Sequence, residues 1–499
     1  CTGTEDLLAP LGSAHDLKGA QAGEAPDPQF NLSPRIGFNL DVFGDQETKL
    51  RGGAAVLNGR IPYVWPGSQY QNNGVTSGFF ASPTTFEPNV NEQPNFGSSV
   101  PNGALHVFSE DFSYPRVLRT SLGLDQQLPG GFVGTLEGQY TNSLENVQVE
   151  NVNLRPPNET LDGIGDNRPI WAYGENGGID TGASFLDQRY DNVLLVSNTD
   201  RGYSYNVTAE LQKQPFEIAD GSVVRGRVAY TYGDSYTVND RNEDTLGSLW
   251  DSAENVNGTN SPGLSRSDFS LGHRIQFNLS YRQEIGENFA LTSSVYYTGL
   301  SGRPFTYTIA NAEDLTGTAS GDNTMFYVPQ SVSQLNLSPI TDRDGNVLRS
   351  VSQQRRDLQR FIDNVDYLDQ SRGGYTDRNG DRTPWEGVVD LKLSLEVFGD
   401  LVGQQQKLIV DANIFNFSSL LGEVFDTDWG TRYGLNNRVA PVRFEGFQDA
   451  ENGNYTPVYQ SNLGTDNPDR NLKETFDSRT TGSTYSSLYQ VQLGIRYQF

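Results

Sequence analysis

The chain has 499 residues, of which 35% are hydrophobic, and a mean hydropathy of −0.55, so it lacks any run of about 20 apolar residues that could form a transmembrane helix. Its formal net charge of −26 argues against a nucleic-acid partner, because phosphate binding requires clustered Lys and Arg side chains. Cys1 is the only cysteine and the three histidines are far apart in sequence, which excludes a disulfide framework and a thiol metal site.

Eleven segments, taken in chain order, alternate apolar and polar residues with the two-residue period of a β-strand. In the first, Ile36, Phe38 and Leu40 alternate with polar residues, and the last ends the chain on Phe499. Each strand therefore has one apolar and one polar face. The predicted strands are about 36–42, 48–58, 115–127, 132–150, 200–213, 222–236, 275–282, 289–297, 389–397, 408–414 and 489–499.

The connections between these strands are alternately short and long. Compact soluble domains rarely tolerate long connections without secondary structure, whereas outer-membrane barrels combine short periplasmic turns with long extracellular loops. The pattern predicts an all-β, transmembrane antiparallel β-barrel and disfavours a soluble β-sandwich. The predicted extracellular loops are 59–114, 151–199, 237–267, 309–384 and 418–485.

The direction of the last strand fixes the direction of the others. A closing strand that stops on a C-terminal Phe resembles the last strand of outer-membrane proteins and runs toward the periplasm. Because neighbouring strands run in opposite directions, the first of eleven strands also runs toward the periplasm. Bacterial single-chain barrels have even strand numbers, so a strand that runs the other way should precede it. We therefore expect residues 1–33 to be an extracellular loop at a truncated N-terminal edge and residues 34–499 to be the C-terminal barrel strands.

Motifs spread over most of the chain resemble those of Oar-like TonB-dependent receptors of the outer membrane. Each motif is weak alone, but together they follow the order found in that family. They include SPRIGF at 33–38, GRIPYVW at 59–65, FSYPRVLRT at 112–120, LGHRI at 271–275, GLSGRPF at 299–305 and NIFNF at 413–417.

The resemblance implies a plugged barrel in the outer membrane of a Gram-negative-type bacterium, operated from the periplasm by the TonB complex. Transporters of this kind have about 22 strands, so eleven strands would form the C-terminal half. The family's plug and TonB-box segment are not found in this sequence. The partners implied are the lipid bilayer, a plug domain, the TonB complex through the missing N-terminal part, and an unidentified ligand.

Charged residues on the polar faces of the strands are candidates for a wall that faces the lumen and contacts a plug. The alternative is that they form ion pairs across strands, which only give the charged groups of a water-exposed face their partners. They are Arg35, Asp41, Arg51, Arg119, Asp125, Glu137, Arg225, Arg227, Arg282, Asp390, Lys392, Glu396, Asp411 and Arg496.

Aromatic residues at strand ends and in adjacent loops are candidates for the belts that anchor a barrel at the membrane–water interfaces. A few of them could instead stack on a ligand in the extracellular vestibule. The candidates are Tyr63, Trp65, Tyr114, Tyr296, Trp385 and Phe417.

One loop is a weak candidate for a structural Ca²⁺ site, namely Asp377, Asn379 and Asp381. An EF-hand requires a Glu at the twelfth loop position, where this chain has Val388. An Asx-rich turn explains the same residues without a metal. No cofactor is predicted.

Enzyme motifs are absent from the sequence, which contains no Gly-x-Ser-x-Gly elbow, no His-Glu-x-x-His and no P-loop. The prediction is an outer-membrane receptor or transporter, with a barrel-anchored surface adhesion or organising protein as the alternative. The acidity is explained by a solvated surface, or by a vestibule that attracts cationic ligands.

Overall fold

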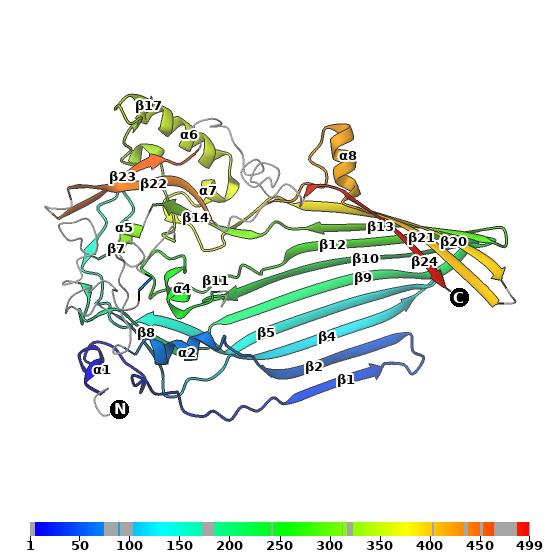
Figure 1. Ribbon diagram of the computed structural model, residues 1–499, viewed down its shortest axis with the longest axis horizontal. Helices are drawn as coiled ribbons and strands as arrows, with labels where there is room; N and C mark the ends of the chain where they lie inside the picture. The colour runs from blue at the N-terminus through cyan, green and yellow to red at the C-terminus, as the bar shows by residue number, and fades with distance from the viewer. Residues whose placement is uncertain are drawn as a thin grey trace.

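The computed structural model describes residues 5–73, 88–89, 103–171, 184–240, 243–311, 313–316, 323–401, 404–433, 438–449, 453–463 and 487–498. The predicted last residue of the final strand, Phe499, lies outside the described residues. Long strands run side by side along the molecule, and their long connections gather at one end (Figure 1).

Eleven strands form one antiparallel sheet, and each pairs with the next predicted strand along the chain. Their order follows the sequence, so the sheet is an up-and-down meander whose edges are the first and last strands. The strands are β1 (Arg35–Asp41), β2 (Thr48–Asn58), β4 (Arg116–Leu128), β5 (Phe132–Asn151), β9 (Gly202–Ala219), β10 (Ser222–Thr237), β12 (Gly272–Ile285), β13 (Phe289–Leu300), β20 (Glu386–Leu401), β21 (Gln404–Phe415) and β24 (Gln490–Gln498).

Short turns join these strands at the end opposite the long loops (Figure 1). The turn between β4 and β5 contains Gly130 and Gly131, whose φ angles of 78° and 73° lie in the left-handed region that favours glycine. Local sequence thereby fixes the register of this hairpin, in which Leu128 lies opposite Phe132.

One face of the sheet is apolar and exposed. A continuous row across neighbouring strands joins Leu40, Leu50, Leu124 and Leu136, and the same face continues to the last strand. On β24, Leu493 is 76% exposed and Ile495 is 77% exposed. Burying such a face is worth about 25 cal/mol per Å² of apolar area, so the sheet requires an apolar medium on this side.

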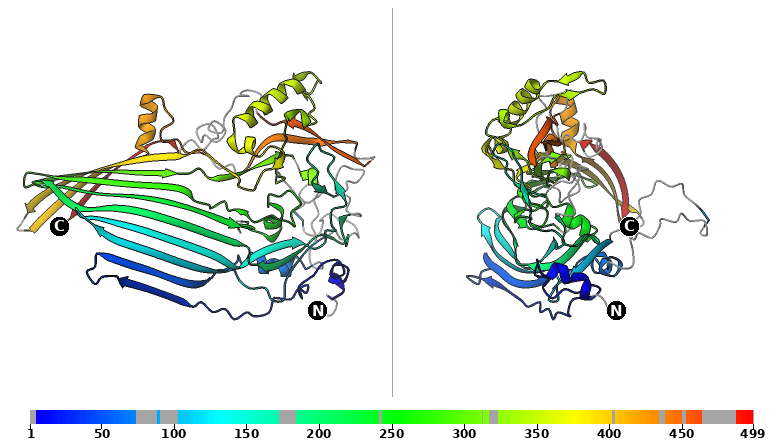
Figure 2. Two further views of the ribbon diagram at one scale, coloured as in Figure 1. Left: turned by 180° about the vertical axis from the view of Figure 1, so that it is seen from behind. Right: turned by 90° about the vertical axis from the view of Figure 1, so that its left-hand side faces the viewer.

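The opposite face is polar and more crowded. Ser280, Ser294 and Ser394 on this face are all less than 10% exposed, although they are small side chains on a sheet with no second layer against it. Crowding of this kind is expected on the inner side of a curved sheet, and the view along the strands shows such curvature (Figure 2). The predicted antiparallel sheet, with one apolar and one polar face, is confirmed.

The long connections contain secondary structure that the sequence patterns did not predict. Within the described residues, no helix is both long and apolar enough to cross a bilayer. The elements are α1 (Glu5–Gly12), α2 (Val64–Gln71), β3 (Gly103–Phe108), β6 (Glu159–Thr160), β7 (Pro169–Ile170), β8 (Tyr190–Thr199), α4 (Leu246–Asp251), β11 (Ser265–Arg266), β14 (Pro304–Ala310), α5 (Glu313–Thr316), β15 (Tyr327–Val328), η1 (Val332–Gln334), β16 (Ile340–Thr341), β17 (Val347–Arg349), α6 (Val351–Asp363), α7 (Asp366–Gln370), β18 (Gly374–Tyr375), β19 (Asp381–Arg382), α8 (Phe417–Phe425), β22 (Arg438–Asp449) and β23 (Asn454–Ser461).

Three of the predicted loops fold together into one body, which we call the cap and define as residues 155–171, 304–384 and 438–463 where described. A sheet in the order β19-β14-β22-β23 packs with α6 and α7 around a single apolar cluster. Its centre includes Phe305, Tyr307, Phe326, Leu358 and Phe444, all nearly inaccessible to solvent. The cap therefore has a hydrophobic core of its own, separate from the long sheet (Figure 1).

Two further clusters cover β5 and β8 at the end of the sheet that carries the long loops. Leu8 and Leu11 of α1 pack with Leu105 and Val193, so the segment predicted as an edge loop contains a helix docked on the structure. The second cluster holds Trp65 of α2 against other strand and helix residues. Both clusters tie the first half of the chain into the folded end of the molecule.

A buried histidine makes this end sensitive to acid. His106 on β3 is 5% exposed, and its Nδ1 atom lies 2.8 Å from the Ser68 hydroxyl. Burial lowers the pKa of His106 from 6.5 to about 4. Between those pH values the unfolded chain binds a proton that the folded chain does not, so stability falls as the pH falls, by up to about 3 kcal/mol.

We expect amide exchange of residues 103–108, corrected for intrinsic rates, to accelerate between pH 6.5 and pH 4. His106→Gln should abolish that acceleration, because glutamine does not titrate. The same acceleration in both proteins would show that His106 is not the group responsible.

Candidate functional site

The polar wall is the face of the sheet that carries all fourteen charged residues predicted to face the lumen. Pairing of opposite residues places them on one side: Arg35 faces Ala55 and then Arg119, and Glu396 faces Ile409 and then Arg496. The sequence period alone places these residues on one side, because a strand in register cannot change the side of alternate residues. That this side faces the lumen stays a prediction.

Ion pairs that cross from one strand to the next, or over one intervening strand, join seven of these residues to one another. Arg51 lies 3.1 Å from Asp125 and 2.6 Å from Glu137, bridging β2, β4 and β5. Arg282 and Glu396 are 3.4 Å apart, and Lys392 and Asp411 are 3.8 Å apart. These cross-strand pairs favour pairing within the wall over plug contact as the role of the charged residues.

Other wall residues have structural partners that the sequence did not reveal. Arg227 pairs with Glu210 at 2.6 Å, and Arg119 donates to the Thr141 hydroxyl. Asp41 accepts hydrogen bonds from the backbone of the first turn, and Asp390 accepts one from the amide of Asn416. Plug contact by this wall stays a prediction.

The predicted aromatic belt is partly wrong. Trp65 has no exposed surface and lies in an apolar cluster at the loop end of the sheet, so it cannot contact lipid. Tyr296 lies on the polar wall, opposite Asn278 and Asp390. Tyr63, Tyr114 and Trp385 are exposed, and Phe417 is half-buried at the start of α8.

A belt that the prediction missed runs across the apolar face at the loop end of the strands. The rings of Tyr203 and Tyr236 are 5.0 Å apart, those of Tyr205 and Tyr232 are 6.2 Å apart, and Tyr232 lies 4.8 Å from His273. Repeated tyrosines on the apolar positions of β9 and β10 were the signal for it in the sequence.

The other edge of the apolar band lies near the short turns. Lys213 Nζ is 4.4 Å from the ring centre of Phe216 and 5.0 Å from that of Phe132, as expected for a lysine reaching toward an interface. Eight residues of β9 separate Tyr205 from Lys213, about 27 Å of strand. Tilted by ~40°, that length spans about 20 Å, close to the ~25 Å apolar band of outer-membrane barrels.

Tryptophan fluorescence can separate the two aromatic environments. In variants that retain one tryptophan each, brominated lipid should quench Trp385, which is exposed beside the belt, and leave Trp65 unquenched. Bromine quenches only on contact or near it, so burial in a protein cluster protects an indole ring. Equal quenching of the two would contradict the burial of Trp65 in a protein cluster.

The predicted Ca²⁺ loop is a junction between the cap and the sheet. Arg378 donates to the carbonyl of Val238 at 2.7 Å, and the Asn379 amide donates to Asp268 at 2.7 Å. Asp381 accepts a hydrogen bond from the Tyr307 hydroxyl. Among the described residues, no group of three or more His, Cys, Asp or Glu side chains is placed to hold a metal. The Ca²⁺ site at this loop stays a prediction.

A buried ion pair stabilises the centre of the cap. Arg168 is 1% exposed and binds both carboxylate oxygens of Asp166, at 2.9 and 2.8 Å. The Tyr375 hydroxyl donates to the same carboxylate at 3.0 Å, and Arg168 also reaches the carbonyl of Met325. The pair joins two segments that were predicted as separate loops.

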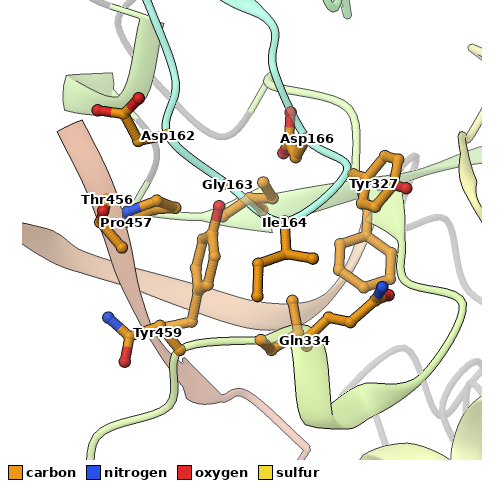
Figure 3. A pocket seen from close by; sticks show the side chains of 13 residues that line it. Asp162, Gly163, Ile164, Asp166, Tyr327, Gln334, Thr456, Pro457 and Tyr459 are labelled. Carbon is orange, nitrogen blue, oxygen red and sulfur yellow. The ribbon is translucent and has the colours of Figure 1, made fainter.

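A pocket of about 80 Å³ opens beside this ion pair. Its apolar wall comes from Ile309, Phe326 and Leu335, and two tyrosines, Tyr327 and Tyr459, line it as well. Figure 3 shows that the lining side chains come from three segments far apart in sequence, around 164, 327 and 459. Segments from three of the predicted loops therefore line the same recess.

Residues 14–418 match the family described as outer membrane beta barrel domain. The chain belongs to that family. Its place is accordingly the bacterial outer membrane, with the apolar face of the sheet against the lipid bilayer. No curated protein matches the chain.

Solved structures similar to this chain are outer-membrane transporters and receptors. The outer membrane transporter YddB from Escherichia coli is 11% identical, with a TM-score of 0.38 over 77% of this chain and 36% of YddB. The ferric enterobactin receptor PfeA from Pseudomonas aeruginosa is 9% identical, with a TM-score of 0.33 over 77% and 34%. The FrpB iron transporter from Neisseria meningitidis is 9% identical, with a TM-score of 0.29 over 77% and 39%. The chain thus spans little more than a third of the length of these structures.

Proposed function

We propose that the chain forms part of the barrel wall and the extracellular cap of a TonB-dependent receptor. This receptor takes up a ligand across the outer membrane. In this proposal the cap captures the ligand, a plug closes the lumen along the polar wall, and the TonB complex moves the plug with energy from the inner membrane. The protein has no catalytic role.

The folding of the long loops into one body with a recess is the observation that carries this proposal. Loops needed only to close a barrel would not require the apolar core around Tyr307 and Leu358, or the buried pair of Arg168 and Asp166. A rigid, preformed surface lowers the entropy lost when a ligand binds. In this proposal the polar wall lines the route that the ligand takes through the lumen.

A surface adhesion or organising protein is the second candidate. It is favoured by the size of the cap, since a large folded body anchored by a barrel could bind another surface without transport. The two functions differ in whether the proton-motive force matters, because adhesion needs no energy supply.

Uptake by living cells tests the proposal. Cells with and without the receptor would be compared for depletion of components from their medium, before and after a protonophore collapses the proton-motive force. We expect receptor-dependent depletion of at least one component that the protonophore stops, while retention at the cell surface persists. Receptor-dependent surface binding with no depletion would instead favour adhesion.

A further inference from the structure

Residues 417–432, which contain α8 and which we call the finger, expose an apolar tip outside the strands. Val424 is 67% exposed, Phe425 is 61% exposed and Trp429 is 55% exposed. The rings of Phe425 and Trp429 are 6.1 Å apart, so they form one patch. Leu420 and Leu421, one helical turn earlier, are half-buried and extend this patch toward the sheet. A patch of large apolar side chains marks a surface that contacts something other than water.

The base of the finger, in contrast, is polar and buried. Asn416 is 5% exposed, and its φ of 50° turns the chain out of β21. Its side-chain amide donates to the carbonyls of Gly430 and Ser487, at 2.8 and 3.1 Å, and its side-chain oxygen accepts from the amide of Ser419. The usual arrangement of buried apolar and exposed polar residues is thus reversed in the finger. Its hydrogen-bonded base holds the apolar tip in a fixed place.

The finger leaves the sheet at the level of aromatic residues on the apolar face. The amide of Val389 donates to the Ser418 hydroxyl at 3.0 Å, and Val389 lies opposite Tyr297. Tyr297 and Trp385 both lie against Gly299. Because Tyr and Trp rings gather where a barrel leaves the hydrocarbon, this level corresponds to the membrane interface on the side of the long loops.

The direction of α8 places the tip beside the sheet. Figures 1 and 2 show α8 standing out from the sheet, away from the hollow around which the strands curve, with its axis across the direction of the strands. Since the strands cross the membrane, a helix that runs across them lies roughly along the membrane plane. The apolar surface of the finger therefore continues the face of the sheet that lies against lipid. Helices placed in this way bury their apolar side at the boundary between headgroups and acyl chains.

The charges of the finger show which force could hold it there. Residues 417–432 contain three acidic residues, Glu423, Asp426 and Asp428, and one basic residue, Arg432, a net charge of −2. Helices held to anionic lipids by charge are instead rich in Lys and Arg. Contact of the finger with a membrane would thus depend on burial of its apolar tip, which salt does not screen.

We propose that the finger is a lateral membrane anchor, whose side chains Val424, Phe425 and Trp429 insert among the acyl chains of the leaflet on the side of the long loops. The contact between protein and lipid then extends beyond the wall formed by the strands. It holds the loop end of β20 and β21 at a fixed depth in the membrane. This contact requires neither a ligand nor a plug, so it does not depend on the proposed transport.

Quenching of Trp429 tests the position of the tip. The complete receptor, with its other tryptophans replaced by phenylalanine, would be reconstituted in phosphatidylcholine vesicles. We expect lipid brominated on its acyl chains to lower the emission of Trp429 at least twofold, and acrylamide in the water to quench it weakly. Leu348→Trp, in a receptor without the other tryptophans, is the control, because Leu348 is apolar and 58% exposed but lies in the cap. Its emission should respond to acrylamide and not to brominated lipid.

Two results of this measurement would overturn the inference. Quenching of Trp429 by acrylamide, to the extent seen for Leu348→Trp, would place the tip in water and leave it free for a partner protein. Protection of Trp429 from both reagents would mean that another part of the receptor covers it.

A double substitution tests whether the apolar side chains themselves hold the tip in lipid. Val424→Ser with Phe425→Ser should reduce the quenching of Trp429 by brominated lipid severalfold and increase its quenching by acrylamide. Val347→Ser with Leu348→Ser removes an equally exposed apolar pair from the cap and should change neither value. Both pairs are exposed, so neither change removes a core contact. Unchanged quenching after the substitutions at 424 and 425, or loss of lipid quenching in 1 M salt without them, would contradict an apolar anchor.

Discussion

Replacing Phe277 with arginine is expected to destabilise the folded protein in lipid by about 2–4 kcal/mol, the cost of an arginine on the lipid face near the bilayer midplane. Phe277 lies on the apolar face of β12, midway between His273 and Tyr281. The guanidinium would have to lie in hydrocarbon, or the bilayer would have to deform around it. Urea unfolding from lipid vesicles measures the loss.

The adjacent residue provides the control, because neighbours on a strand point to opposite faces. Gln276→Arg places the same charge on the polar wall, beside Ala229 and Thr298, and should change the unfolding free energy by no more than about 0.5 kcal/mol. Similar losses at both positions would mean that the two faces of β12 meet the same environment.

Removing the buried cation of the cap is expected to have an effect of similar size in a different part of the molecule. Arg168→Met leaves Asp166 buried without its partner, which should cost about 3–5 kcal/mol. The cap should then become sensitive to protease and exchange its amides rapidly, while the sheet keeps its resistance. Hydrogen exchange by segment measures both.

A surface pair supplies the comparison. Arg443→Met removes the 2.5 Å contact with Glu445, where the arginine side chain is 47% exposed, and should cost less than about 1 kcal/mol. If the two variants were equally stable, the pair of Arg168 and Asp166 would not hold the cap together.

The long sheet could be predicted from the sequence because apolar and polar residues alternate within each strand. In β20, for example, Leu391, Leu393 and Leu395 alternate with Lys392 and Ser394, and no distant contact is needed to assign the faces. Register followed from short turns such as the one at Gly130. The period likewise assigned all fourteen charged residues of the polar wall to one side of the sheet, whereas their facing a lumen or a plug stays a prediction.

The cap could not be predicted in the same way, because its core joins residues that are hundreds of positions apart. Phe444 packs in the same cluster as Leu161 and Tyr307, and the alternation of Phe305, Tyr307 and Ile309 with threonines indicates a strand but not its partners. Trp65 was misassigned for the same reason: an aromatic near a strand end can face lipid or a protein cluster, and only tertiary contacts decide. Likewise, the sequence around Asn379 predicts an Asx turn. It gives no sign that this loop hydrogen-bonds to Asp268 and Val238, which lie more than 100 residues away in the chain.

Accessibility along one strand tests most directly whether hydrocarbon covers the apolar face. Nitroxide labels would be placed one at a time at residues 389–397 of β20 in the receptor reconstituted in lipid vesicles, with Cys1 replaced. Val389, Leu391, Leu393, Leu395 and Val397 should then collide with oxygen, which dissolves in lipid, and the residues between them with a water-soluble nickel complex. Uniform access to the nickel complex along the strand, or protection of the odd positions from both reagents, would contradict the account.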